Sequence, residues 1–263
     1  MANYFDLVKM PTFSTDDAVQ LTGNLKTAQS LLRRLVRRGL VRKVRSQLYA
    51  PVDAGTNQVI ASRFQIATGI DRRCYVSHHS AFEYYGLANQ VFYDVYVSSV
   101  TRFSSFEFEG WTYRRVPSKS EDGVVTPRDS LGVRVTDLER TVVDNIKDFE
   151  RIGGLDELVA CLDALPYLES QRLLHYLSGY GSQVLYQKAG YFLERYRDTL
   201  RLPDRFFDEC LRRMGKSTRY LLSERGQDNV YDRRWQLVVP RGLFGSGGVA
   251  SHSRRTPALQ STR

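Results

Sequence analysis

The chain has 263 residues, of which 42% are hydrophobic and 25% charged, with a formal net charge of +9 at pH 7. This is a globular composition with enough material for one large or two smaller domains. Its three cysteines, Cys74, Cys161 and Cys210, lie far apart without a Cys-x-x-Cys pair, which argues against a disulfide framework or a zinc site. Neither a secretory leader pattern nor an apolar run of roughly 20 residues occurs, so we expect a cytoplasmic protein without a membrane anchor.

The N-terminal segment reads as two helices separated by a tight turn. Ser14 and Asp17 suit the start of a first helix that runs to about Leu21, and Gly23 suits the turn. Apolar residues then recur at helical spacing, with Gly39 as the stop. We expect the stripe that packs inward to contain Leu25, Ala28, Leu32 and Leu35, widened by Leu31 and Val36.

The second helix and the segment after it carry nearly all the excess positive charge. Eight basic and no acidic residues lie between Ala18 and Val52, whereas the rest of the chain holds 30 basic and 29 acidic residues. Such a cluster is typical of a surface that binds a polyanion, although a solvated basic face is the simpler alternative. The outward helix positions that we expect to contact DNA are Lys26, Thr27, Gln29, Ser30, Arg33, Arg34 and Arg37.

A basic hairpin is predicted after the second helix. The segment from Leu40 to Ala50 has apolar residues at both ends and a basic, polar middle, which favours two short strands. Two helices followed by a basic hairpin form the winged helix-turn-helix, whose second helix enters the major groove. We expect the wing residues Arg42, Lys43 and Arg45 to contact phosphates rather than bases. A winged helix can instead serve protein–protein contact, which the acid-free basic segment disfavours.

Residues beyond the hairpin predict a mixed domain. A connecting helix fits 59–69, and short strands fit 74–76, 91–97 and 106–113. Thr136 and Glu139 suit a capping box for a helix that ends at Asp148, and four more helices are predicted at 155–165, 168–177, 184–200 and 203–214. The predicted fold class is therefore α+β: a winged helix-turn-helix at 1–54, a domain at 55–240 with a small sheet and a C-terminal helical bundle, and a disordered tail at 241–263.

Several sequence blocks, in order, resemble the AbiEi-type antitoxins of type IV toxin–antitoxin systems. The resemblance covers about residues 10 to 239 and is carried by the winged helix ending at 48–50 and by the blocks 75–81, 85–87, 135–144, 187–194 and 235–239. One departure is that Ser46-Gln47 stands in the wing where the family usually has Arg-Gly. The resemblance implies an antitoxin that neutralises a nucleotidyltransferase-like toxin and represses its own operon by binding inverted repeats in double-stranded operator DNA.

The sequence shows no recognisable catalytic site, cofactor motif or metal site. Ser77, His78, His79 and Ser80 lack the Gly-x-Ser-x-Gly frame of a nucleophile, and we interpret them as a helix cap and packing residues. His79 and Glu83 share a helical spacing, yet no third metal ligand stands at a recognisable distance along the chain. We therefore predict a non-enzymatic protein without a cofactor or a metal. An enzyme whose catalytic residues escape recognition remains an alternative.

Four residues of the larger domain are candidate contacts for a protein partner. They are Ser77, His78, Arg140 and Asp144, although Arg140 and Asp144 also suit an intrahelical ion pair. The competing function is a stand-alone winged-helix transcriptional regulator whose larger domain senses a ligand or forms a dimer. A neighbouring gene for a nucleotidyltransferase-like protein would favour the antitoxin.

Overall fold

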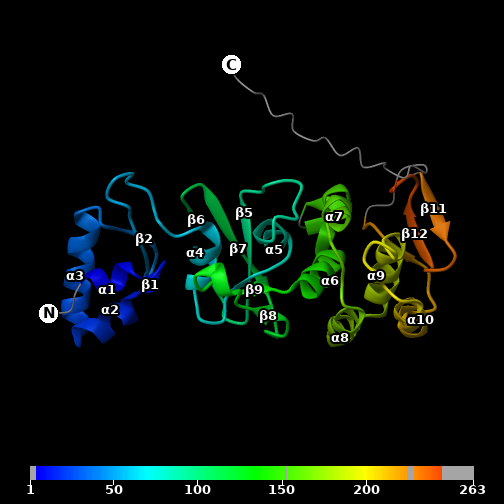
Figure 1. Cartoon of the computed structure of the whole chain (residues 1–263), viewed down its shortest axis with the longest axis horizontal. Coiled ribbons are helices and arrows are strands. Elements are labelled where there is room, and N and C mark those ends of the chain that lie inside the picture. The colour runs from blue at the N-terminus through cyan, green and yellow to red at the C-terminus, as the bar shows by residue number, and fades with distance from the viewer. Residues whose placement is uncertain (1–3, 152, 224–227, 245–263) are drawn as a thin grey trace, which may run out of the picture. The chain divides into compact units, whose positions relative to one another are not determined.

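The computed structural model describes residues 4–151, 153–223 and 228–244, and the chain forms two compact units, 1–215 and 216–263 (Figure 1). The larger unit contains a winged helix-turn-helix, a six-stranded sheet and a set of helices, so the expected α+β class is confirmed. The predicted division between residues 54 and 55 stays a prediction.

The N-terminal elements form the winged helix-turn-helix that the sequence predicts. Ser14 caps α2 by accepting a hydrogen bond from the Asp17 amide at 3.1 Å, and Gly23 ends α2 in the left-handed conformation (φ 69°). The strands form one small sheet in the order β1-β3-β2. The elements are α1 (Tyr4–Val8), β1 (Phe13–Ser14), α2 (Thr15–Thr22), α3 (Leu25–Arg37), β2 (Val41–Arg45) and β3 (Leu48–Pro51).

The apolar stripe of α3 packs on the first two helices with two corrections. Ala28, Leu32 and Leu35 are buried as expected, in a cluster of side chains that includes Leu7 and Phe13. Leu25 and Val36, which we predicted to face inward, are 52% and 39% exposed. They lie at the first and the penultimate residue of the helix, where the neighbouring helices no longer cover them.

Residues of the wing hairpin are buried in two hydrophobic clusters. One face of β2 and β3 covers the helices, while Val44, Leu48 and Ala50 join the buried cluster of the following sheet. At the hairpin turn Gln47 adopts a left-handed backbone (φ 64°), a conformation that glycine takes at lower cost. The hairpin is therefore packed against the sheet domain rather than free to move alone.

The central sheet has six strands in the order β6-β7-β5-β4-β9-β8. The β5–β7 and β4–β9 pairs are parallel, and the other pairs are antiparallel. Its buried face contains Val76, Val97, Tyr113 and Val135. The strands are β4 (Tyr75–Val76), β5 (Asp94–Ser99), β6 (Phe106–Phe108), β7 (Trp111–Pro117), β8 (Val124–Val125) and β9 (Val135–Thr136), with a 3-10 turn at Arg128–Ser130.

Two short helices flank this sheet. The helix α4 (Arg63–Gly69) packs on β4 and β5. It begins four residues later than the predicted 59–69 because Ser62 and Gln65 form a capping box there. The helix α5 (His79–Tyr84) follows β4 directly and contacts β5 and α6 (Leu138–Asp148).

The helices after the sheet pack around buried leucine and phenylalanine side chains. α6 contacts α7, α8 and α9, and α9 contacts α10. The predicted capping box of Thr136 and Glu139 is wrong by one position, because Asp137 is the cap and accepts a hydrogen bond from the Arg140 amide at 2.8 Å. The remaining helices are α7 (Gly154–Asp163), α8 (Ser170–Tyr180), α9 (Gln183–Arg195) and α10 (Asp204–Arg213), with a 3-10 turn at Phe149–Arg151.

The smaller unit contains a three-stranded sheet that we did not predict. Its strands are β10 (Arg219–Tyr220), β11 (Asn229–Asp232) and β12 (Leu237–Pro240), in the order β10-β12-β11. Leu221, Trp235 and Val239 are buried. Of the tail that we predicted to be disordered, residues 245–263 lie outside the described residues.

Candidate nucleic-acid interface and polar pocket

The helix α3 is held by its cap and its buried stripe, so its outer face is fixed. The Asn24 carboxamide oxygen accepts hydrogen bonds from the Lys26 and Thr27 amides at 2.8 and 3.2 Å. The helix has 13 residues and is therefore about 20 Å long. A helix of this size fits the major groove of B-form DNA, which is about 12 Å wide.

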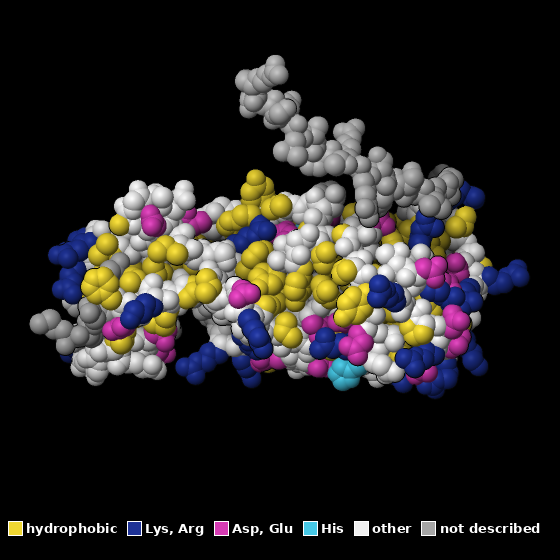
Figure 2. Space-filling view, in the orientation of Figure 1, with side chains coloured by type: hydrophobic (Ala, Val, Ile, Leu, Met, Phe, Trp, Pro, Cys, Tyr) yellow, Lys and Arg dark blue, Asp and Glu magenta, His cyan; other side chains and the backbone are white. Residues whose placement is uncertain are grey.

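The outer face of α3 carries the cationic and polar side chains that the sequence places there. Within the described part of the chain, none of its arginines forms an ion pair with a carboxylate, so their charge is available to a ligand. Figure 2 shows Lys and Arg side chains gathered over α3. The exposed residues of this α3 face are Lys26, Thr27, Gln29, Ser30, Arg33, Arg34 and Arg37.

The three cations of the wing differ in how freely they can reach a ligand. Lys43 is exposed. Arg42 is ion-paired with Glu109 and donates a hydrogen bond to the Asn57 carbonyl at 2.7 Å. The Arg45 guanidinium lies 5.0 Å from the centre of the Phe106 ring. We therefore expect Lys43 to be the wing residue that contacts phosphate without first breaking an internal contact.

Ser77 and His78 lie at a strained junction between β4 and α5. His78 has φ 56° and ψ −139°, a conformation that is costly for any residue except glycine and that often marks functional sites. The Ser77 hydroxyl contacts His78 Nδ1 at 2.8 Å and the Ser98 hydroxyl at 2.7 Å. The side chains of Ser77 and His78 thus meet because the junction is not helical, which our sequence interpretation did not foresee.

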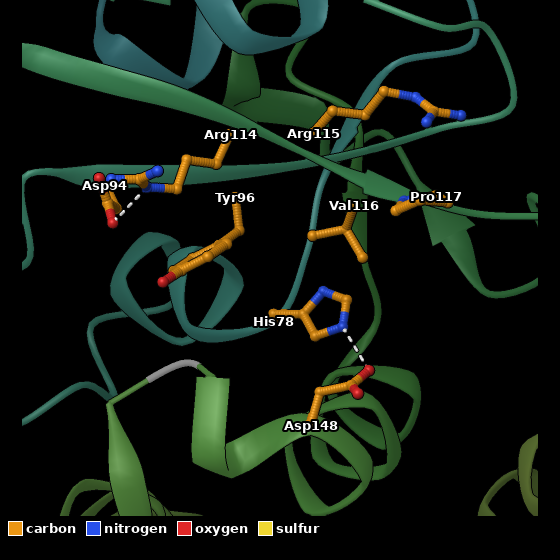
Figure 3. A pocket seen from close by; sticks show the side chains of 8 residues that line it. All are labelled: His78, Asp94, Tyr96, Arg114, Arg115, Val116, Pro117 and Asp148. Carbon is orange, nitrogen blue, oxygen red and sulfur yellow. Dashed lines mark ion pairs between the residues drawn. The ribbon is translucent and has the colours of Figure 1, made fainter. Parts of the chain in front are cut away.

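A pocket of about 370 Å³ opens beside His78 (Figure 3). In this view the imidazole extends toward Asp148 of α6, and its Nε2 lies 3.5 Å from the Asp148 carboxylate. Arg114 pairs with Asp94 at 2.6 Å on another wall. The mixture of paired charges and apolar surface suits a small polar ligand.

The charge of Asp148 is fixed by its neighbours. Burial alone would raise the pKa of this carboxyl group, but hydrogen bonds from His78 and Lys147 outweigh burial and lower the pKa to about 2. Asp148 is therefore an anion at neutral pH. Our sequence analysis did not single it out, because nothing in the sequence indicates that it meets His78, 70 residues earlier in the chain.

Arg140 and Asp144 form the intrahelical pair that the sequence suggests. The Arg140 Nε donates to Asp144 at 2.7 Å, with the two side chains only 9% and 1% exposed. Arg140 also donates to the Asp122 carbonyl at 2.8 Å, and the Tyr180 hydroxyl contacts both members of the pair. The nearby carboxylate of Asp144 raises the pKa of Arg140 although burial opposes it. This burial favours a structural role over direct contact with a partner.

A buried cluster of polar side chains lies between α5 and α7. His79, Glu157 and Cys161 bring three potential metal-ligand atoms within 4.8 Å of one another. The sequence analysis considered only His79 of the three as a metal ligand, together with Glu83. Glu157 escaped notice because it lies 78 residues after His79.

Together these features define an α+β protein with an exposed cationic helix and a polar pocket in its larger domain. The chain matches no family model and no curated protein sequence. It is similar to the solved structure entitled "Crystal structure of RV2827C protein from Mycobacterium tuberculosis", with a TM-score of 0.63 and 18% sequence identity over 89% of each chain. A likeness at this identity establishes the fold alone.

In residues 4–151, 153–223 and 228–244, none of the helices has the length and apolar character needed to cross a bilayer.

Proposed function

We propose that the chain is a DNA-binding transcriptional regulator whose α3 face reads bases in the major groove. The observation that carries this proposal is the α3 face itself: seven exposed polar or cationic side chains without a carboxylate among them. Arg33 and Arg37 stand one helical turn apart and suit bidentate contacts with guanine, while Gln29 suits adenine. Lys43 on the wing adds a contact with phosphate.

The regulator is further proposed to be the antitoxin of a type IV toxin–antitoxin pair. The support is that several sequence blocks, in their order along the chain, resemble AbiEi-type antitoxins. In this role the protein neutralises a nucleotidyltransferase-like toxin and represses its own operon through operator repeats. It performs no catalysis itself.

The DNA proposal is tested with operator DNA selected from the region upstream of the protein's own gene. Fluorescence anisotropy compares the full chain with Arg33→Ala and Arg37→Ala, each expected to weaken binding by about 1–3 kcal/mol, roughly 5- to 150-fold. The matched control is Arg205→Ala, because Arg205 is an exposed arginine on α10, outside the α3 face. Unchanged affinity in both α3 variants would contradict the proposal.

The antitoxin proposal is tested by co-expression with the product of the neighbouring gene. The full chain is used, because a cut after residue 54 would remove Val44, Leu48 and Ala50 from the core of the sheet domain. We expect the wild type and the Arg33→Ala/Arg37→Ala variant to rescue growth equally, since neutralisation does not need the α3 face. Failure of the wild type to rescue growth would refute the antitoxin role while leaving DNA binding untouched.

A second candidate function is regulation by a small ligand. The pocket favours this function, because one of the residues that line it, His78, has a strained backbone of the kind that often marks functional sites. A polar metabolite that binds the pocket would change the affinity of the full chain for operator DNA, and His78→Ala would abolish that response. If no fraction of a polar metabolite extract changes the affinity, this candidate fails.

A further inference from the structure

Two helices contribute an i, i+4 pair each to a buried cluster. His79 and Glu83 come from α5, and Glu157 and Cys161 come from α7. The side chains of His79, Glu83 and Glu157 are 1%, 2% and 2% exposed, and Cys161 is 1% exposed. Ionisable groups so deeply buried need a partner for every charge, because an isolated charge in the interior is strongly disfavoured.

The two carboxylate oxygens of Glu157 differ in their hydrogen-bond partners. Its Oε1 accepts hydrogen bonds from the Asn89 and Gln90 amides at 3.0 and 3.1 Å, and it lies 2.8 Å from His79 Nε2. Its Oε2 is buried and has no hydrogen-bond partner among the described residues. One oxygen of this buried carboxylate therefore has two backbone donors, whereas the other has none.

The imidazole of His79 stands between two carboxylates. Its Nε2 faces Glu157, and its Nδ1 lies 3.0 Å from Glu83 Oε1 without the alignment of a hydrogen bond. A neutral imidazole carries one N–H, so one of its nitrogens would present a lone pair to an anion. Glu83 is also ion-paired with Arg63, so the carboxylate without a Lys or Arg partner among the described residues is that of Glu157. A cation bound beside Glu157 would balance its charge.

Cys161 adds a third potential metal ligand to His79 and Glu157. Its Sγ lies 3.5 Å from Glu157 Oε1, and the three ligand atoms of His79, Glu157 and Cys161 lie within 4.8 Å of one another. One nitrogen, one oxygen and one sulfur ligand form a donor set that suits Zn²⁺.

We propose that His79, Glu157 and Cys161 bind one Zn²⁺ as three protein ligands, so that the ion ties α5, and with it the central sheet, to α7. The ligands are His79 Nε2, the unsatisfied Oε2 of Glu157 and the Cys161 thiolate, while the Glu83 carboxylate lies 3.0 Å from His79 Nδ1 on the opposite side of the ring. Binding releases the Cys161 thiol proton to solvent as the sulfur–zinc bond forms. The thiolate and the carboxylate then balance the two charges of the ion.

The test measures the metal content of the full-length protein. The protein is expressed in zinc-supplemented medium, dialysed and analysed by mass spectrometry for metals, with roughly one zinc per chain expected. Cys161→Ser should remove the zinc. The matched control is Cys210→Ser, because Cys210 is equally buried but lies outside the cluster.

A spectroscopic measurement keeps the proposal testable if Cys161→Ser does not fold. Wild-type protein refolded with Co²⁺ should show a thiolate-to-cobalt charge-transfer band and the visible bands of a tetrahedral site. Zinc-free wild-type protein that also lacks these bands would overturn the proposal. Zinc that persists in Cys161→Ser but leaves in Cys210→Ser would overturn it as well.

Discussion

Asp144→Asn removes the carboxylate that neutralises the buried guanidinium of Arg140. Arg140 Nε donates to that carboxylate at 2.7 Å, and both side chains are nearly inaccessible to water. Removing one member of a buried ion pair costs about 3–5 kcal/mol, because the other charge is left uncompensated. Arg140 keeps its hydrogen bond to the Asp122 carbonyl at 2.8 Å and its contact with Tyr180, so we expect the lower end of that range.

Urea unfolding at pH 7 measures this loss. A destabilisation of about 3 kcal/mol corresponds to a fall in Tm of roughly 6–12 °C in a unit of this size. The control is Asp6→Asn, since Asp6 of α1 forms an exposed pair with Lys9, one residue past the end of that helix, and exposed pairs contribute only about 0–1 kcal/mol. If Asp144→Asn were as stable as the wild type, the structural role of the pair would be refuted.

Four further substitutions probe the wing and the pocket. Lys43→Ala should lower the slope of log affinity for DNA against log salt concentration by about one. Arg42→Ala should change that slope less, because Arg42 is already paired with Glu109. Equal slopes for the two variants would contradict this prediction. Gln47→Gly should raise the free energy of unfolding by roughly 0.5–1 kcal/mol, since Gln47 has a positive φ, and a decrease measured in urea would argue against it. The folded pKa of Asp148 lies below the unfolded value of 3.8, so its stabilisation of about 2 kcal/mol is present above pH 4 and disappears as the pH falls to about 2. Asp148→Asn should flatten that part of the stability–pH curve, and an unaltered curve would disprove the assignment.

The sequence predicts the winged helix well because its signals are local. Leu32 and Leu35 repeat at helical spacing, Gly39 follows the end of α3, and the exposed arginines alternate with the buried stripe. The error at Leu25 has a physical cause, since periodicity shows which residues share a face but not how far the neighbouring helices extend.

The polar pocket and the buried cluster could not be predicted in the same way. Asp148 meets His78, and Glu157 meets His79, only after the chain has folded over long separations in sequence. The strain at His78 is also invisible in the sequence, because a histidine between a strand and a helix ordinarily adopts an unstrained backbone. Local patterns thus predicted the exposed cationic face of α3, whereas the other sites required the tertiary structure.

The central claim, that α3 reads bases, is tested most directly by pairing a change in the protein with a change in the DNA. Replacing a contacted guanine of the operator with 7-deazaguanine removes the N7 acceptor that an arginine would use. We predict that this replacement weakens binding by the wild type by about 1–3 kcal/mol but leaves the affinity of Arg33→Ala or Arg37→Ala unchanged at the matching base. An equal loss in the wild type and in both variants, at every guanine tested, would contradict the account.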